Sequence, residues 1–409
     1  MKKIVIVLLF FLTKLNILAQ QEDTSKISIN TLPFAYYNNS IGWVLGTFSS
    51  IKGYPQENSF TKAGALISSN GSRYVYLQAD EVQNPLFKRQ FIRPDFFVGK
   101  LGEVKEYIGI PVNGIRPGSN ESSEKQHLLL HGTDYWFELN LKHLLPVAKG
   151  KNEDFNYVMT YKNYEEIQEK FFDFGKIFFE TKLIYRDMSL RNDFVKVKIV
   201  ASAIDFSISN DNTNYIYFPT FGTYQKLSYI KQYKAFGCDV PADIWKVDLR
   251  FFYPVFDDIL SNYPTVIAFN FLTMDTPTAD ELYQDKLKRG KLFVGPNLGG
   301  TKYLRGYKDL RYHDRSLIYY SLELRKSLNW NPFNYFELTR KIGIDLIELA
   351  FFGDLGRVAP KWKLDELHSD LKYTYGIGLR ALMKGMVLRM DMGKSKDNFM
   401  IQMFIEQPF

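Results

Sequence analysis

The stretch "IWKVDLRFFY", residues 244–253, decides what kind of fold this chain can build. Apolar and charged side chains alternate along it with a period of two, the pattern of a β-strand with one apolar and one polar face. The apolar set is Trp245, Val247, Leu249, Phe251 and Tyr253, and the charged set is Lys246, Asp248 and Arg250. The same alternation recurs in "DYWFELNLK" (134–142) and "YTYGIGLRA" (373–381), so we predict an all-β protein with an antiparallel sheet.

Two kinds of fold satisfy this alternation. A soluble sandwich buries its apolar faces against each other, whereas a membrane barrel turns them to lipid. Many of the alternating segments run to about 9–11 residues, the length that a tilted strand needs to cross a bilayer. Aromatic side chains such as Tyr135 and Tyr253 stand near strand ends, and full charges occupy the polar faces. These features favour a transmembrane barrel with a wet interior.

The N-terminus has the features of an export signal. A basic start, an apolar run and a small residue at Ala19 predict a signal peptide over residues 1–19. We expect a short periplasmic extension over residues 20–40 and the barrel over residues 41–409. Candidate strands within the barrel include 155–163 and the terminal 398–408. The single cysteine, Cys238, cannot form an internal disulfide.

Charge and residue spacing exclude several classes of function. The chain has 52 basic and 45 acidic residues, a mild and dispersed excess that does not indicate nucleic-acid binding. His127 and His131 stand four residues apart, but in a polar loop around three leucines they do not indicate a metal site. "GPNLGG" (295–300) lacks the lysine and hydroxyl of a phosphate-binding loop. We therefore expect no enzyme activity, no metal and no cofactor.

The C-terminus ends on an aromatic residue. "NFMIQMFIEQPF" (398–409) alternates up to Phe409, and a terminal strand that closes on Phe resembles the C-terminal signal of bacterial outer-membrane barrels. Pro408 cannot donate a hydrogen bond to a ladder, which is compatible with a strand end.

Several motifs in the last part of the chain occur in a characteristic order. "LGG", "LRGY", "ELR", "FFGDLG", "YGIGLR", "LRMDMG" and the terminal Phe follow one another from about Gly299 to Phe409. This order resembles the BamA/TamA superfamily of outer-membrane assembly and translocation barrels (the bacterial surface antigen family). The resemblance implies a location in the outer membrane of a Gram-negative-type bacterium. It also implies a sixteen-stranded barrel whose sixth extracellular loop enters the lumen.

The resemblance also implies a role for the loop's arginine. Arg305 is expected to bind two acids on the inner wall, Glu323 and Asp354. Gly306 would allow a tight loop tip, with Tyr307 packed beside it. These residues would together form a latch that holds the loop inside.

The segment before the first expected strand is too short for a folded domain. Members of this family that insert or move polypeptides usually carry repeated periplasmic domains there. We therefore expect a short family member that assists insertion or transport of proteins, or lipid, through a lateral seam. Its partners would be outer-membrane lipids and other outer-membrane or periplasmic proteins that supply the missing domains. A passive pore, or a structural subunit of a larger outer-membrane complex, is the alternative.

Overall fold

The computed structural model describes eleven parts of the chain and consists almost entirely of strands. The described residues are 27–38, 40–57, 59–80, 82–151, 171–215, 218–238, 240–256, 264–278, 293–335, 343–383 and 386–409. The strands are Ser28–Asn38 (β1), Gly42–Lys52 (β2), Phe60–Ser68 (β3), Arg73–Asp80 (β4), Val82–Gln83 (β5), Gln90–Glu106 (β6), Leu128–Ala148 (β7), Lys176–Arg191 (β8), Lys196–Asp211 (β9), Gly222–Gln232 (β10), Ala242–Phe256 (β11), Thr265–Asp275 (β12), Asn297–Leu298 (β13), Tyr312–His313 (β14), Ser316–Leu328 (β15), Leu346–Ala359 (β16), Lys372–Met383 (β17), Met386–Ser395 (β18) and Phe399–Ile405 (β19). The helical turns are Lys149–Lys151 (η2), Pro332–Asn334 (η5) and Leu364–His368 (α3).

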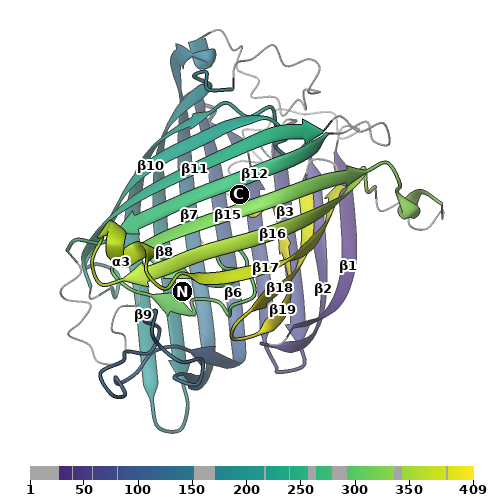
Figure 1. Ribbon diagram of the computed structural model, residues 1–409. Helices are drawn as coiled ribbons and strands as arrows, with labels where there is room; N and C mark the ends of the chain where they lie inside the picture. The colour runs from purple at the N-terminus through teal and green to yellow at the C-terminus, as the bar shows by residue number, and fades with distance from the viewer. Residues whose placement is uncertain are drawn as a thin grey trace.

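The strands form one antiparallel β-barrel (Figure 1). Within the described residues, 17 strands belong to a single sheet, and β13 pairs only with β14. Each strand of this sheet pairs with the next one along the chain, from β1 with β2 to β18 with β19, except that β4 pairs with β6 and β12 pairs with β15. Both β4 and β5 pair with β6. The count of sixteen barrel strands stays a prediction.

The two faces of the strands differ as the alternation predicts. On β11, Trp245 and Tyr253 are about half exposed on the outside. Asp248 is buried on the inside, where it accepts a hydrogen bond from Arg250 at 2.6 Å. An apolar exterior with paired charges inside is the arrangement of a barrel in lipid. None of the helices among the described residues is long and apolar enough to span a membrane.

Two predicted boundaries differ from the structure. Residues 20–40 were expected to be an extension, but residues 28–38 form β1 and pair with β2 along their whole length. The expected last strand 398–408 ends at Ile405, because Glu406 adopts a positive φ of 84° that turns the chain out of the sheet. The predicted signal peptide and the candidate strand 155–163 lie outside the described residues.

The two ends of the sheet overlap. The registers place Ile347, Ala381 and Ile405 on the outward face of β16, β17 and β19, because the neighbouring Glu348 and Arg380 face inward. These three residues share one apolar cluster with the inward-facing Leu32, Phe34 and Phe48 of β1 and β2. The first strands therefore pack over the outer surface of the last strands. We call this two-layer contact the seam.

Candidate functional site

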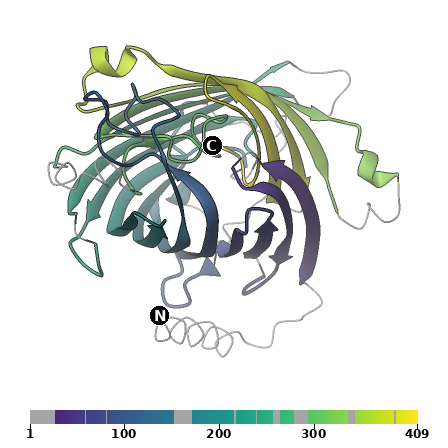
Figure 2. The ribbon, with the colours of Figure 1, turned by 90° about the horizontal axis from the view of Figure 1, so that it is seen from below.

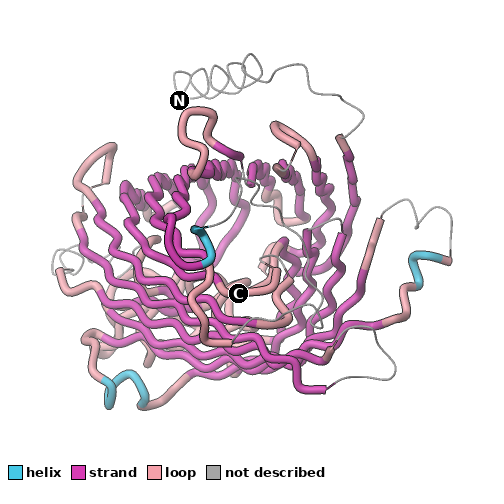
Figure 3. Tube along the Cα trace, turned by 90° about the horizontal axis from the view of Figure 1, so that it is seen from above, coloured by secondary structure: helices cyan, strands magenta, loops and turns pink. Residues whose placement is uncertain are grey.

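The segment between β12 and β15 packs against the inner wall of the barrel. Figure 3 shows loops inside the ring of strands. Residues 293–315 contain the short β13–β14 pair and a tight turn, in which Leu304 and Gly306 adopt positive φ values of 49° and 104°. Leu304 is fully buried in a cluster with Tyr319 of β15 and Val358 of β16. This turn holds Arg305 against the wall.

Arg305 binds carboxylates from three strands. Its Nε donates to Asp354 Oδ2 at 3.0 Å and its Nη2 donates to Asp354 Oδ1 at 2.7 Å, so the two side chains meet in a bidentate pair. Its Nη1 donates to Glu323 Oε1 and, at 3.4 Å, to Asp391 Oδ2. The guanidinium also lies 3.8 Å from the centre of the Phe352 ring. The sequence-predicted residues Arg305, Glu323 and Asp354 are therefore brought together.

The contact is fully buried. Arg305, Glu323 and Asp354 are each at most 1% exposed. Burial alone would lower the pKa of Arg305, but the carboxylates of Asp354 and Glu323 raise it well above its usual value. The backbone N–H of Arg305 also donates to Asp354 Oδ2 at 3.0 Å. Asp354 thus fixes both the side chain and the backbone of the turn.

A wider charge network surrounds this contact, and most of it was not predicted. Arg380 donates to both Glu323 oxygens at 2.8 Å and to Glu348 at 3.1 Å, and Arg325 donates to Glu323 at 2.7 Å. Arg389 pairs with Asp391 at 3.2 Å. Four arginines therefore face four carboxylates. The motifs "YGIGLR" and "LRMDMG" contain Arg380, Arg389 and Asp391, so their charged residues at inward positions were the available signal.

Glycine allows the turn to contact the backbone of β18. A Cβ on Gly306 would lie 3.1 Å from the carbonyl of Gly393, and a Cβ on Gly393 would lie 2.9 Å from the carbonyl oxygen of Arg305. Ser395 Oγ donates to the Gly306 carbonyl at 2.8 Å. Tyr307 is buried beside the turn, with its ring 5.3 Å from that of Tyr312. The expected tight tip is thus built from two glycines, of which Gly393 was not predicted.

A second loop covers the segment. Arg116, between β6 and β7, pairs with Asp314 at 2.8 Å and donates to the carbonyl of His313 at 2.7 Å. Arg311 reaches in the other direction, to Ser122 in the same loop and to Asp397 at 2.8 Å. The segment is therefore held on the wall by Arg305 and on its other side by arginine contacts to this loop.

The C-terminal residues fold into the barrel, where Figure 2 places the C-terminus inside the ring of strands. Phe409 is 6% exposed, and its ring lies 6.2 Å from that of Phe252 and 4.9 Å from the Arg325 guanidinium. Glu406 accepts hydrogen bonds from Lys62 at 3.0 Å and from Arg93 at 3.2 Å. The tail therefore connects the last strand to β3 and β6. The expected role of Phe409 as a recognition signal stays a prediction.

The described residues do not bring three or more His, Cys, Asp and Glu side chains together in a group that could hold a metal ion.

Comparison with known proteins identifies the family. The model of the Omp85 superfamily domain matches residues 135–398. The search of curated proteins returned no match. Three similar solved structures are CdiB from Escherichia coli (13% identity, TM-score 0.56, 95% of this chain and 62% of that one), CdiB from Acinetobacter baumannii (14%, 0.52, 93% and 60%) and BamA from Haemophilus ducreyi lacking POTRA domains 1–3 (14%, 0.48, 93% and 69%).

At these identities the two CdiB structures show a shared fold, and this chain spans less than two thirds of either CdiB chain. The family model, by contrast, covers more than half of this chain and includes Arg305, Glu323, Asp354 and Asp391. The chain therefore belongs to the Omp85 superfamily, and it is an outer-membrane β-barrel protein of a Gram-negative bacterium.

Proposed function

We propose that this protein inserts or translocates polypeptide at the outer membrane and that it acts at the seam. Members of the Omp85 superfamily are transporters or assembly factors, and we expect no catalytic activity. The observation that carries the proposal is the overlap of β1 and β2 with the last strands. Phe48 is 2% exposed within the seam cluster, and the contacts of this cluster are between side chains. Such contacts can separate without disrupting the backbone ladder of the wall.

The lengths of the two end strands support the same proposal. β1 has 11 residues and β19 has 7, so the last strand is too short to pair with the whole edge of the first. A strand edge offers backbone N–H and C=O groups that an incoming extended segment can pair with. A client strand could therefore add to β1 when the two layers of the seam separate.

In this proposal, the Arg305 turn fixes the inner wall beside the moving seam. Arg305 joins β15, β16 and β18 through Glu323, Asp354 and Asp391. We propose that this latch keeps residues 293–315 inside as an extracellular loop folded into the lumen. The latch would keep β15 to β18 together as one unit while β1 and β2 move relative to them.

A reversible crosslink tests the role of the seam. In a Cys238→Ser background, Phe34→Cys with Ile405→Cys places one cysteine in each layer of the seam cluster. As a matched control, Leu227→Cys with Val247→Cys joins opposed residues of β10 and β11, which a ladder already holds together. Each protein is reconstituted in liposomes and supplied with an unfolded eight-stranded barrel, and insertion is measured as protease protection of that client.

Oxidation should abolish client insertion by the seam pair, reduction should restore it, and the control pair should insert in both states. Full insertion by the oxidised seam pair would refute action at the seam. If no variant inserts the client, yet both oxidised and reduced proteins conduct ions across a planar bilayer, the protein is a passive pore instead.

A further inference from the structure

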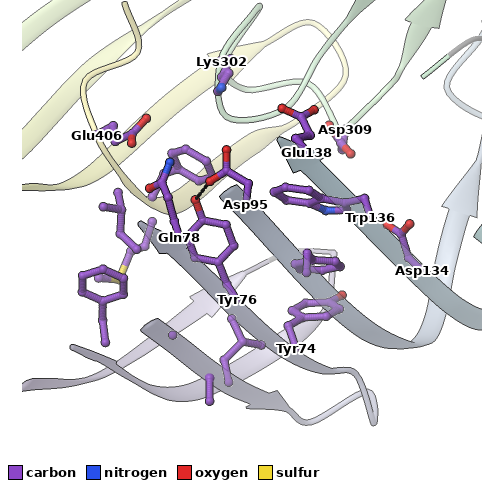
Figure 4. A pocket seen from close by; sticks show the side chains of 18 of the residues that line it. Tyr74, Tyr76, Gln78, Asp95, Asp134, Trp136, Glu138, Lys302, Asp309 and Glu406 are labelled. Carbon is purple, nitrogen blue, oxygen red and sulfur yellow. Dashed lines mark hydrogen bonds between the residues drawn. The ribbon is translucent and has the colours of Figure 1, made fainter. Parts of the chain in front are cut away.

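A cavity of about 630 Å³ opens inside the barrel beside the seam (Figure 4). Its floor is formed by β4, β6 and β7, and its rim includes Lys302 and Asp309 of the docked segment and Glu406 of the C-terminal tail. The volume lies within the range of about 300–1,000 Å³ typical of small-molecule sites. The contacts of Arg305 do not involve this cavity.

One row of the floor is aromatic. Tyr76, Phe97 and Trp136 are directly opposed in the registers of β4, β6 and β7, so their side chains form a continuous row. The rings of Phe97 and Trp136 are stacked at 5.5 Å with an angle of 11°, and that of Tyr76 lies 5.9 Å from Trp136. Tyr74, two residues before Tyr76 on β4, adds a fourth ring beside the row, 5.5 Å from that of Phe97. The result is an apolar platform of four rings within the interior.

The next inward row is polar. Gln78, Asp95 and Glu138 are opposed in the same registers, two residues further along each strand. At about 3.4 Å per residue, the polar row runs about 7 Å from the aromatic row. Gln78 is 1% exposed and lines the cavity, and its Nε2 has no hydrogen-bond partner among the described residues. A buried donor of this kind is stabilised when a ligand supplies an acceptor.

Four carboxylates around the cavity are each paired with a basic side chain. Asp134 accepts two hydrogen bonds from Arg186, at 2.9 and 2.7 Å, and Glu138 pairs with Lys182 at 3.0 Å. Asp95 pairs with Arg93 at 3.3 Å, and Glu406 pairs with Lys62. A cation at one of these carboxylates, or an anion at its basic partner, would have to displace the other member of the pair. An acyl chain would leave the Gln78 donor without an acceptor.

We propose that this cavity binds a short, neutral saccharide, a function separate from polypeptide insertion. The C–H face of a pyranose ring is apolar and can stack on the aromatic row. Its hydroxyl groups both donate and accept hydrogen bonds, so they suit a polar row of an amide and paired carboxylates. The separation of about 7 Å between the two rows allows one ring to contact both.

The test uses the purified full-length protein in a polyoxyethylene detergent, because maltoside detergents carry a sugar headgroup. The probes are maltotriose, cellotriose and the trimer of N-acetylglucosamine, and binding is measured by isothermal titration calorimetry. Trp136→Leu removes the centre of the platform and Gln78→Leu removes the orphan donor. Trp245→Leu is the matched control, because this tryptophan is 49% exposed on the outside of β11.

At least one trisaccharide should bind the wild-type protein, and Trp136→Leu and Gln78→Leu should each weaken binding by about tenfold or more. Trp245→Leu should bind like the wild type, and all variants should keep the heat-dependent gel shift of a folded barrel. Absence of binding at about 10 mM of every probe, or binding that neither cavity variant weakens, would overturn the proposal. The proposal would also be overturned if a fatty acid or trilysine bound saturably in the cavity, as shown by loss of this binding in Trp136→Leu, and competed with no trisaccharide.

Discussion

At the scale of single residues, Arg305 carries more than one contact. Its side chain bridges Asp354, Glu323 and Asp391, and its backbone N–H binds the same Asp354. Removing one partner of a buried ion pair costs about 3–5 kcal/mol, because the remaining charges are left without compensation. Arg305→Ala should therefore release residues 293–315 before it unfolds the barrel. Arg305→Lys should rescue little, because a single ammonium cannot reproduce the bidentate pair.

The measurement is protease access to residues 293–315 in intact cells, alongside client insertion. Glu323→Gln and Asp354→Asn should each resemble Arg305→Ala, and combining them with it should be less than additive. Wild-type protection and insertion in Arg305→Ala would reduce the motif to an ordinary turn.

A substitution at Gly393 tests sterically whether the Arg305 turn packs against β18. A Cβ at this position would lie 2.9 Å from the carbonyl oxygen of Arg305, so Gly393→Ala should lift the turn from β18 and increase protease access. Gly353→Ala is the matched control, because its Cβ would meet only the Thr374 oxygen at 4.0 Å. Equal protection of both variants would mean that the turn adapts to the added methyl group.

At the scale of elements, the docked segment should respond to pH through Lys308. Burial, and next the charge of Lys105, lower the pKa of Lys308 to about 8. A released lysine has a pKa of about 10.4. The docked state therefore binds the proton less tightly, and its stability rises as pH increases from about 8 to about 10.

Protease access to residues 293–315 should therefore fall over this interval, after correction for protease activity. Lys308→Met should remove the change with pH. Lys302→Met should keep it, because Lys302 is exposed in the same segment. A pH dependence that survives in Lys308→Met would assign the effect to another group.

The C-terminal tail allows packing and recognition to be separated. Phe409 stacks near Phe252, so Phe252→Ala removes much of the same contact while leaving the terminus intact. In refolding from urea into liposomes, deletion of Phe409 and Phe252→Ala should have similar effects. In cells, deletion of Phe409 should lower the amount of assembled protein much more than Phe252→Ala does, if the terminal aromatic residue is recognised during assembly. Similar losses in cells would assign Phe409 to packing alone.

The elements also show why some features could be predicted from the sequence and others could not. β11 and β15 each have one lipid face and one polar face, so a period of two revealed them. β1 was missed because its inward residues Leu32, Phe34 and Tyr36 are apolar as well, which removes the alternation. The contact of Arg305 with Glu323 and Asp354 could be predicted, because the order of the motifs resembles that of a known superfamily. The inward turn at Glu406 depends on Lys62, 344 residues away, and no local pattern carries that information.

At the scale of the whole molecule, the barrel closes by overlap of its first and last strands. We therefore expect that a change which weakens this overlap lowers stability and speeds client insertion. Phe48 is buried in the seam, where truncation to alanine should cost about 3–5 kcal/mol. Its loss removes apolar contact between the two layers while leaving the ladders of β2 intact. Phe48→Ala should therefore lower the temperature at which the protein loses its fast migration on unboiled gels, and it should also speed client insertion.

Leu45→Ala is the control, because Leu45 lies on the same strand but is 56% exposed on the outside. It should change neither the transition temperature nor the insertion rate appreciably. If Phe48→Ala lowers stability and slows insertion in the same proportion, the seam is only structural packing. A faster but less stable variant would identify separation of the two layers as the step that limits insertion.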